Sequence, residues 1–163
     1  MKTDSLQDLF IEELSDLHSA GSQILKVLPK MAEASVAPEL RQIFQVQIVE
    51  VRAQVESVEM VFQTHGVEAI NKRCRSMEGL VEETEEMIVE RAASHARDAG
   101  LSLKALRMQH YLRAAGDGAS RTYALLAQEA AHLRGQTSDE EDDARGDELI
   151  ELANYNTDLE AVH

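Results

Sequence analysis

The residues best suited to chemistry are a glutamate and a histidine one helical turn apart, Glu129 and His132. Helical bundles that hold two iron or manganese ions use Glu-x-x-His pairs, because a carboxylate and an imidazole three residues apart project from one helix face. A dinuclear centre takes two such pairs and two further glutamates, and Glu129 with His132 is one short motif. Metal binding by Glu129 and His132 is one hypothesis, and a surface pair in an alanine-rich helix is the other.

The other reactive groups stand without matching partners in the sequence. His18 and His110 lie near apolar positions but lack carboxylates at a matching spacing, so we expect core or boundary roles for them. Cys74 is the one cysteine, so an internal disulfide is impossible. Its neighbours Arg73 and Arg75 could lower its pKa, but without a resolving cysteine a structural role is the simpler interpretation. With no P-loop, nucleophile elbow or dinucleotide fingerprint, the sequence favours a protein that is not an enzyme.

Composition and charge narrow the class of protein. The 163 residues suffice for one domain, 1–163, and two prolines, eight glycines and no tryptophan accompany abundant helix formers, which predicts an all-α fold. The formal net charge of −14 argues against nucleic acid or an anionic membrane as a partner, because phosphate groups are bound by basic surfaces. Without a signal peptide, a long apolar span or paired cysteines, the expected location is the cytoplasm.

The most regular pattern predicts a helix from Pro38 to about Thr64 that stops at Gly66. Its apolar residues recur at alternating steps of four and three, as in a helix packed nearly parallel to its neighbours. They are Phe44, Ile48, Val51, Val55, Val58 and Phe62. Beside this stripe stand Val49 and Arg52, at the spacing where a metal-binding bundle would have a Glu-x-x-His pair.

A stripe with the same spacing near the start of the chain predicts another long helix. Ser5 is its expected N-cap, with Asp8 in the capping-box position. Gly21 falls within the buried stripe, so either a neighbouring side chain fills the space or a side chain has been lost there. Pro29 precedes the end of the stripe, so we expect a kink, or a break at which Pro29 starts a new helix.

Two further long helices and a short one complete the expected architecture. Ser76 is predicted to cap a short helix through Ala92, and a long helix is expected from about Ala96, with a bend at residues 116–118. Residues 128–134 are interpreted as a separate turn or as the kinked start of a last helix. Four long stripes, with the short helix between the second and third long helices, predict a four-helix bundle with a long crossover.

Several blocks of sequence resemble a known family. They are DLFIEELSDLHSA (8–20), LPKMA (28–32), CRSMEGLVEE (74–83), RDA (97–99), HY (110–111) and LAN (152–154). With these blocks the chain is identified as a member of the YciF-like family of bacterial ferritin-like proteins. The resemblance implies a ferritin-like four-helix bundle, a homodimer, an association with stress responses and, in many members, a dinuclear metal centre.

The first two helices depart from the metal-binding pattern of that family. Where the first long helix of the family has a glutamate, this chain has Gly21. Where the second has Glu-Glu-x-His, this chain has Val49, Glu50, Val51 and Arg52, which leaves one glutamate. If Arg52 occupies the histidine position, its permanent positive charge repels a metal ion.

The last two helices also lack ligands that the resemblance implies. The Glu-His-Tyr-Glu block of the third long helix has become Gln-His-Tyr-Leu, with His110 retained and Leu112 at its end. In the fourth helix Glu141 and Asp142 remain, but Gly146 stands where an aspartate is expected. A dinuclear site takes about four carboxylates and two imidazoles, so no cofactor is expected.

Two functions follow from this pattern. The first is a noncatalytic structural or interaction protein of the stress response that has lost its metal centre. The alternative is an iron-handling protein or oxidoreductase that binds iron or manganese at an unconventional site formed by Glu50, His110, Asp142 and Glu13. Arg52 either replaces the lost metal charge by pairing with Asp142 or Glu50 near the bundle axis, or forms a surface pair with Glu56.

A homodimer is the partner that the resemblance implies. We expect the contact on the short helix around Met87 and Ile88, or on an exposed apolar strip of the first two helices, because apolar residues beyond one bundle's core need cover.

Overall fold

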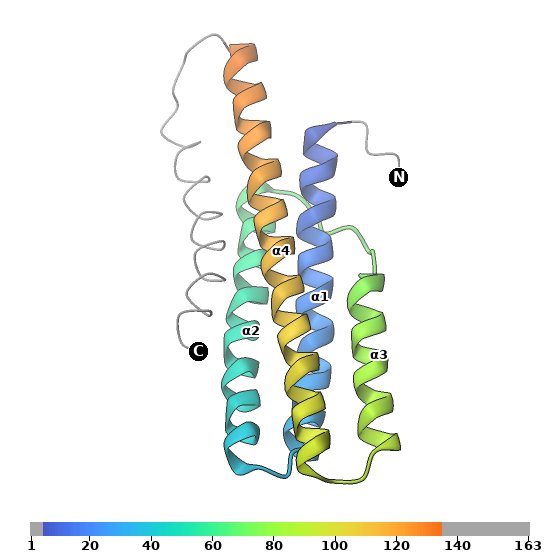
Figure 1. Ribbon diagram of the computed structural model, residues 1–163. Coiled ribbons are helices and arrows are strands. Elements are labelled where there is room, and N and C mark those ends of the chain that lie inside the picture. Colours follow the sequence, from blue (N-terminus) through green and yellow to red (C-terminus); the bar gives the residue numbers. More distant parts are fainter. Residues whose placement is uncertain (1–4, 135–163) are drawn as a thin grey trace.

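The computed structural model describes residues 5–134, which form four α-helices joined by short connections and no β-strand within that range. The helices are α1 (Leu6–Ala34), α2 (Pro38–His65), α3 (Arg75–Glu90) and α4 (His95–Arg134). Helix α1 packs against the other three, and α3 packs against α1 and α4 (Figure 1). The all-α prediction is confirmed, and the short helix follows the second long helix as expected. The predicted last helix, with Asp142 and Gly146, lies outside the described residues.

The start of α1 and both ends of α2 follow local rules. The Ser5 side chain accepts a hydrogen bond from the Asp8 amide at 3.1 Å, which confirms the predicted N-cap of α1. Pro38 lies in the first turn of α2, and Gly66 ends the helix in the left-handed conformation at φ 61°. That conformation favours a residue without a Cβ.

Pro29 does not break α1, so the predicted alternative of a new helix starting there is wrong. The helix continues to Ala34, with Leu28 and Met31 on the buried face on either side of the proline. Burying each large apolar side chain stabilises the fold by about 1.5–3 kcal/mol. That gain offsets the hydrogen bond that the proline nitrogen cannot donate.

The start of α3 also differs from the prediction. Its N-cap is Cys74 and not Ser76, and no side chain caps it. The Cys74 amide donates to Ser19 Oγ at 2.9 Å, and Gln23 Nε2 donates to the Cys74 carbonyl at 3.0 Å. These contacts from α1 hold the backbone where α3 begins, so tertiary structure overrides the local cap signal.

Helix α4 runs without interruption through two segments that were expected to disturb it. Residues 116–118 remain helical, and residues 128–134 continue α4, so both predicted alternatives, a separate turn and the kinked start of a last helix, are wrong. Gly116 is buried, and Gly118 lies beside Glu13 of α1. The small residues let α4 approach α1 closely, so packing offsets the low helix propensity of glycine.

One apolar core lies between the helices. Its largest fully buried side chains are Phe44, Leu14, Leu17, Leu28, Met31, Met77, Leu101, Met108, Val27 and Val58. They come from all four helices. None of the helices within residues 5–134 combines the length and the apolar character that a bilayer-spanning helix needs.

Candidate functional site

A metal centre was considered at the middle of the bundle, next to Gly21. Side chains of α2 fill the space there. Gly21 is buried on α1, and a Cβ built on it would lie 2.6 Å from Val55 Cγ2 and 3.9 Å from Val51 Cγ1 of α2. Carbon atoms in ordinary contact are about 3.5–4.0 Å apart. Of the two alternatives for Gly21, the structure supports the first, because Val55 fills the space.

The placement of Val49 and Arg52 near the bundle axis is wrong. Val49 is 69% exposed and Arg52 is also exposed. Val49 lies two residues before Val51 on the buried face and Arg52 one residue after it, which turns them about 200° and 100° around the helix. The polar side chains that α2 does bury are Gln47 and Gln54, which are neutral amides.

Arg52 therefore does not take the interior position that a substitute for the metal charge would need. Asp142, its proposed partner, lies outside the described residues. Within residues 5–134 no ion pair joins Arg52 to Glu56 either. Positions 21 and 112 face inward as predicted, with Leu112 only 4% exposed.

The remaining metal candidates do not converge. Glu50 is half-buried on α2, whereas His110, Glu129 and His132 are exposed on α4. No three His, Cys, Asp or Glu side chains within residues 5–134 are grouped as a metal site. At the positions considered for the centre, Gly21 and Leu112 are buried without a ligand group, Val49 and Arg52 are exposed, and Glu50 is a single half-buried carboxylate. These residues do not fit a dinuclear iron or manganese centre, which takes about four carboxylates and two imidazoles.

His18 is half-buried at the boundary between α1 and α2, as expected. Its Nε2 lies 2.9 Å from Glu59 Oε1, and its ring packs edge-on against Phe62 with centroids 6.3 Å apart. The histidine thus joins two helices through one polar and one apolar contact.

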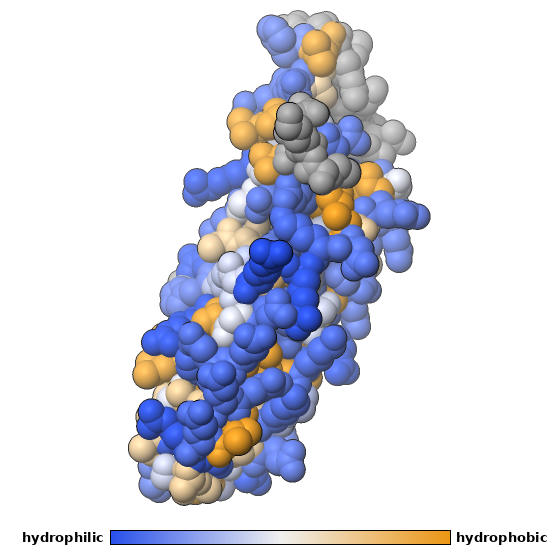
Figure 2. All heavy atoms as spheres, turned by 90° about the vertical axis from the view of Figure 1, so that its right-hand side faces the viewer, coloured by the Kyte–Doolittle hydropathy of each residue, from blue (hydrophilic) through white to orange (hydrophobic). Residues whose placement is uncertain are grey.

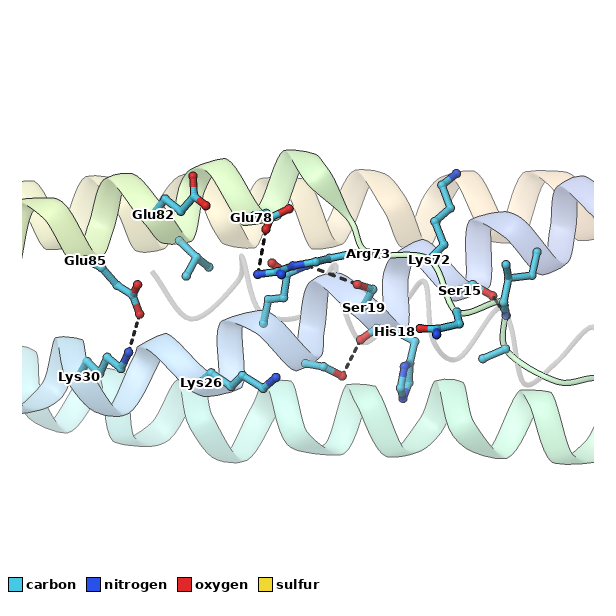
Figure 3. A pocket seen from close by; sticks show the side chains of 16 residues that line it. Ser15, His18, Ser19, Lys26, Lys30, Lys72, Arg73, Glu78, Glu82 and Glu85 are labelled. Carbon is cyan, nitrogen blue, oxygen red and sulfur yellow. Dashed lines mark hydrogen bonds and ion pairs between the residues drawn. The ribbon is translucent and has the colours of Figure 1, made fainter. Parts of the chain in front are cut away.

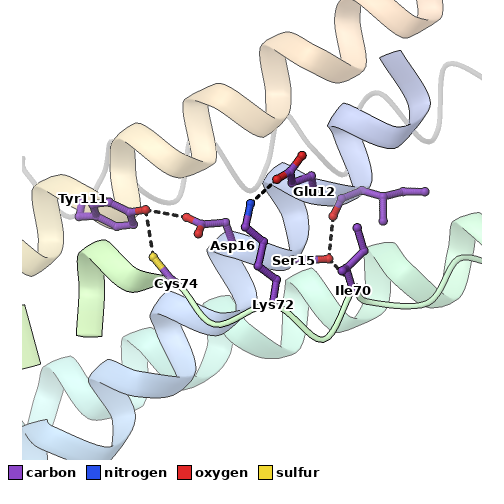
Figure 4. Close-up of polar contacts among 8 residues, drawn as sticks. Glu12, Ser15, Asp16, Ile70, Lys72, Cys74 and Tyr111 are labelled. Atoms are coloured by element: carbon purple, nitrogen blue, oxygen red, sulfur yellow. Dashed lines mark hydrogen bonds and ion pairs between the residues drawn. The ribbon is translucent and has the colours of Figure 1, made fainter. Parts of the chain in front are cut away.

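A polar network that the sequence pattern did not reveal links α1, α4 and the α2–α3 loop (Figure 4). The Tyr111 hydroxyl donates to Asp16 Oδ2 at 2.6 Å and accepts from Cys74 Sγ at 3.0 Å. Burial raises the pKa of Tyr111, and the carboxylate of Asp16 raises it further because it accepts from the neutral phenol. The hydroxyl therefore stays protonated and acts as a fixed donor.

Cys74 is only 1% exposed, and burial raises the pKa of its thiol. The sequence-based idea that Arg73 and Arg75 lower that pKa is wrong, because burial is the largest influence on the thiol and raises its pKa. A neutral, buried thiol that donates to Tyr111 has a structural role.

Side chains of α1 also hold the loop between α2 and α3. Ser15 Oγ accepts from the Ile70 amide at 2.9 Å, one turn before Ser19 and two turns before Gln23 bind Cys74. These polar residues lie at helical spacing, so one face of α1 serves as the docking surface for residues 70–74. The spacing was a usable signal, but the sequence did not show what it faces.

A groove of about 770 Å³ lies beside this docked loop, between α1 and α3 (Figure 3). Lys30 of α1 pairs with Glu85 of α3 at 2.5 Å, and Arg73 of the loop pairs with Glu78 of α3 at 2.9 Å. Cations and carboxylates alternate along the groove, so its electrostatic potential is not dominated by charge of either sign. Exposed pairs of this kind contribute about 0–1 kcal/mol each.

Fold and site together define an all-α helical bundle in which two of the positions considered for metal, Gly21 and Leu112, are buried and carry no ligand group. The chain belongs to the family described as a domain of unknown function, DUF892, whose model matches residues 5–161. This agrees with the resemblance found in the sequence.

Individual relatives agree with that assignment. Protein YciF of Escherichia coli (strain K12) is 32% identical over 163 residues, covering 99% of this chain and 98% of that protein. The crystal structure of the E. coli stress protein YciF matches with a TM-score of 0.72 and 31% identity, over 95% of this chain and 98% of that one. YcfI, a putative structural protein from Rhodopseudomonas palustris, shares the fold at a TM-score of 0.79 and 24% identity, over 96% and 90% of the two chains.

Proposed function

We propose that this protein is a noncatalytic structural or interaction protein of the bacterial stress response, acting in the cytoplasm as a ferritin-like bundle without a dinuclear metal centre. The observation that carries the proposal is the contact at Gly21, where Val55 takes the space that a ligand side chain would need. Leu112 on α4 adds a second apolar position. Full-length similarity to a stress protein supports the biological context.

Metal loading tests this function. Untagged protein is incubated anaerobically with ferrous iron, or separately with Mn²⁺, then desalted and analysed for bound metal. We expect no stoichiometric metal, because the described interior supplies too few anionic ligands. Two ions per chain that survive desalting would overturn the proposal.

Measuring the rate of ferrous oxidation distinguishes the proposed noncatalytic function from the alternative of an iron-handling enzyme. That alternative needs Glu50, His110 and Asp142 to act together, so Asp142→Ala and His110→Ala should each lower the rate if it holds. We expect equal and negligible rates in the wild type and both variants. A measurable rate that Asp142→Ala abolishes would favour the enzyme.

We also propose a homodimer, with the contact on α2. Met87 and Ile88 of α3 pack against the core, and Met87 Sδ lies 2.6 Å from the position of a Cβ at Gly100, so these residues are used within the chain. The face of the molecule that includes α3 is largely hydrophilic, with scattered apolar side chains (Figure 2). On α2 the exposed apolar residues are Ile43, Val46, Val49 and Met60, and a second copy would cover them.

Sedimentation velocity at micromolar concentration tests the dimer and its surface. Val49→Glu places a charge in the proposed contact and should yield monomers. Val89→Glu is the matched control, since Val89 is 84% exposed on α3, and it should remain dimeric. A monomeric wild type would refute the dimer. If Val89→Glu dissociated the dimer and Val49→Glu did not, the contact would lie on α3.

A further inference from the structure

The groove between α1 and α3 separates its charges across its width (Figure 3). Among the described residues that line it, the α1 side contributes Lys26 and Lys30 and no carboxylate, and the α3 side contributes Glu78, Glu82 and Glu85 and no cation. Its volume of about 770 Å³ lies within the range of about 300–1,000 Å³ that small-molecule sites have. A molecule in the groove would therefore have positive charge on one side and negative charge on the other.

Two ion pairs join α3 to the rest of the groove and leave one position between them open. The pairs are those of Lys30 and Arg73 with glutamates of α3. Lys26 lies between these pairs on the α1 side (Figure 3), and Glu82 lies between the two paired glutamates on α3. Within residues 5–134 neither Lys26 nor Glu82 has an ion-pair or hydrogen-bond partner.

The charges that remain in the groove are equal and opposite. Lys30 and Arg73 are neutralised by α3, and Lys72 is neutralised by a glutamate of α1. The ammonium of Lys26 and the carboxylate of Glu82 are left, on opposite sides of the groove. A ligand with a single charge would pair with one of them and leave the other unpaired, whereas a zwitterion pairs with both.

Hydroxyl groups on the α1 side of the groove offer further hydrogen bonds. Ser22 Oγ donates to the His18 carbonyl at 2.8 Å, so its lone pairs can still accept. Ser19 Oγ accepts from the Cys74 amide at 2.9 Å and from Gln23 Nε2 at 3.3 Å, so its proton can still be donated. A ligand with an ammonium and a carboxylate can use one hydroxyl with each of these groups.

We propose that this groove binds a small zwitterion of amino-acid chemistry, whose carboxylate pairs with Lys26 and whose ammonium pairs with Glu82. A free α-amino acid and the two ends of a short peptide share this chemistry. The site is independent of the structural role proposed above, because Lys26 and Glu82 are exposed and take no part in the core. Exposed ion pairs are weak, so the expected Kd is about 1–10 mM.

An NMR titration of the full chain tests the proposal, with alanine and trialanine as separate probes. Amide shifts should saturate below about 50 mM ligand, and they should be confined to residues 69–73 and the facing turns of α1 and α3. The probe that binds more tightly identifies the source, a free amino acid or a peptide. If neither probe gave saturable shifts at these residues, the proposal would be overturned.

Analogues that carry one charge test whether both ends of the ligand are bound. The N-acetylated form of each probe lacks the ammonium, and the C-amidated form lacks the carboxylate. Each should bind about three- to fivefold more weakly than the parent probe, which is the effect of one exposed ion pair. If either analogue bound as tightly as its parent, a single charge would suffice and the zwitterion would be ruled out.

Charge-neutralising variants assign the two contacts. Lys26→Gln and Glu82→Gln should each weaken binding of the parent probe by about three- to fivefold. Lys26→Gln should leave binding of the C-amidated form unchanged, because that form lacks the carboxylate that Lys26 would bind. Glu86→Gln is the matched control, since Glu86 is exposed on α3 and does not line the groove. Equal weakening by Glu86→Gln would assign the effect to net charge and reject the site.

Discussion

Arg97 and Asp98 are neighbours in the sequence, yet they bind opposite ends of three different helices. Arg97 donates to the carbonyls of Ala34 at 2.5 Å and of Arg91 at 2.9 Å, which end α1 and α3. Asp98 accepts from the amides of Val36 at 3.0 Å and Ala37 at 2.8 Å, just before α2. The cation thus meets helix C-termini and the anion meets a helix N-terminus, which matches the dipoles at both.

Replacing Asp98 should destabilise this end of the bundle. Burial raises the pKa of Asp98, but the hydrogen bonds from Val36 and Ala37 outweigh it, so the pKa lies below 3.8. Its stabilisation is therefore present above the unfolded pKa and is lost as pH falls through the folded value. Asp98→Asn should cost about 1–3 kcal/mol of unfolding free energy at neutral pH, measured by urea unfolding, and less in strong acid. Asp117→Asn serves as control, and an equal loss there would contradict the prediction.

The contact between Gly21 and Val55 makes position 21 intolerant of even one methyl group. Gly21→Ala should destabilise by about 1–3 kcal/mol through overpacking, reduced by up to about 1 kcal/mol of helix propensity. In a Val55→Ala background the same change should become neutral or stabilising. The double-mutant cycle, measured by urea unfolding, should thus give a favourable coupling energy.

Gly79→Ala is the control for helix propensity. A Cβ at Gly79 of α3 meets nothing within 4 Å, so this change should stabilise by up to about 1 kcal/mol. If Gly21→Ala behaved like Gly79→Ala, the packing account of the bundle's middle would be wrong.

The thiol of Cys74 should be unreactive in the native protein. It is buried, and its raised pKa keeps the thiolate population low at neutral pH. A chromogenic disulfide reagent should label it only through opening of the fold, so the labelling rate should rise with urea in step with the unfolded fraction. Fast labelling without urea would show that the site is open.

Tyr111→Phe tests the network around that thiol. The change removes the donor to Asp16 and should cost about 1–3 kcal/mol of unfolding free energy, because a charged acceptor loses its partner. The rate of Cys74 labelling should increase by the factor that corresponds to this loss of unfolding free energy. An unchanged stability would mean that water replaces the hydroxyl at no cost.

The loop between α2 and α3 should loosen when its acceptor on α1 is removed. Ser15→Ala deprives the Ile70 amide of its partner at 2.9 Å, so hydrogen exchange at Ile70 should become faster. Ser22→Ala is the control, because Ser22 Oγ donates within α1 to the His18 carbonyl. If both variants changed exchange at Ile70 equally, the docking contact would not be what holds the loop.

The sequence by itself determined the features that depend on near neighbours. The N-cap at Ser5, the stop at Gly66 and the buried positions Gly21 and Leu112 follow from cap chemistry and helical periodicity, which act within a few residues. Family resemblance added the identity of the fold. These signals could not determine whether Val49 faces the core or the solvent, since a shift of one residue turns a side chain by about 100° around the helix.

Only the tertiary structure decided which residues the buried faces of the helices contact. Tyr111 and Asp16 are separated by 95 residues in the chain and yet share a hydrogen bond, and α3 starts where α1 binds Cys74. The continuity of α1 through Pro29 likewise rests on contacts with other helices. Burial and partners arise from packing between distant segments, and the energy gained there overrides the weaker local preferences.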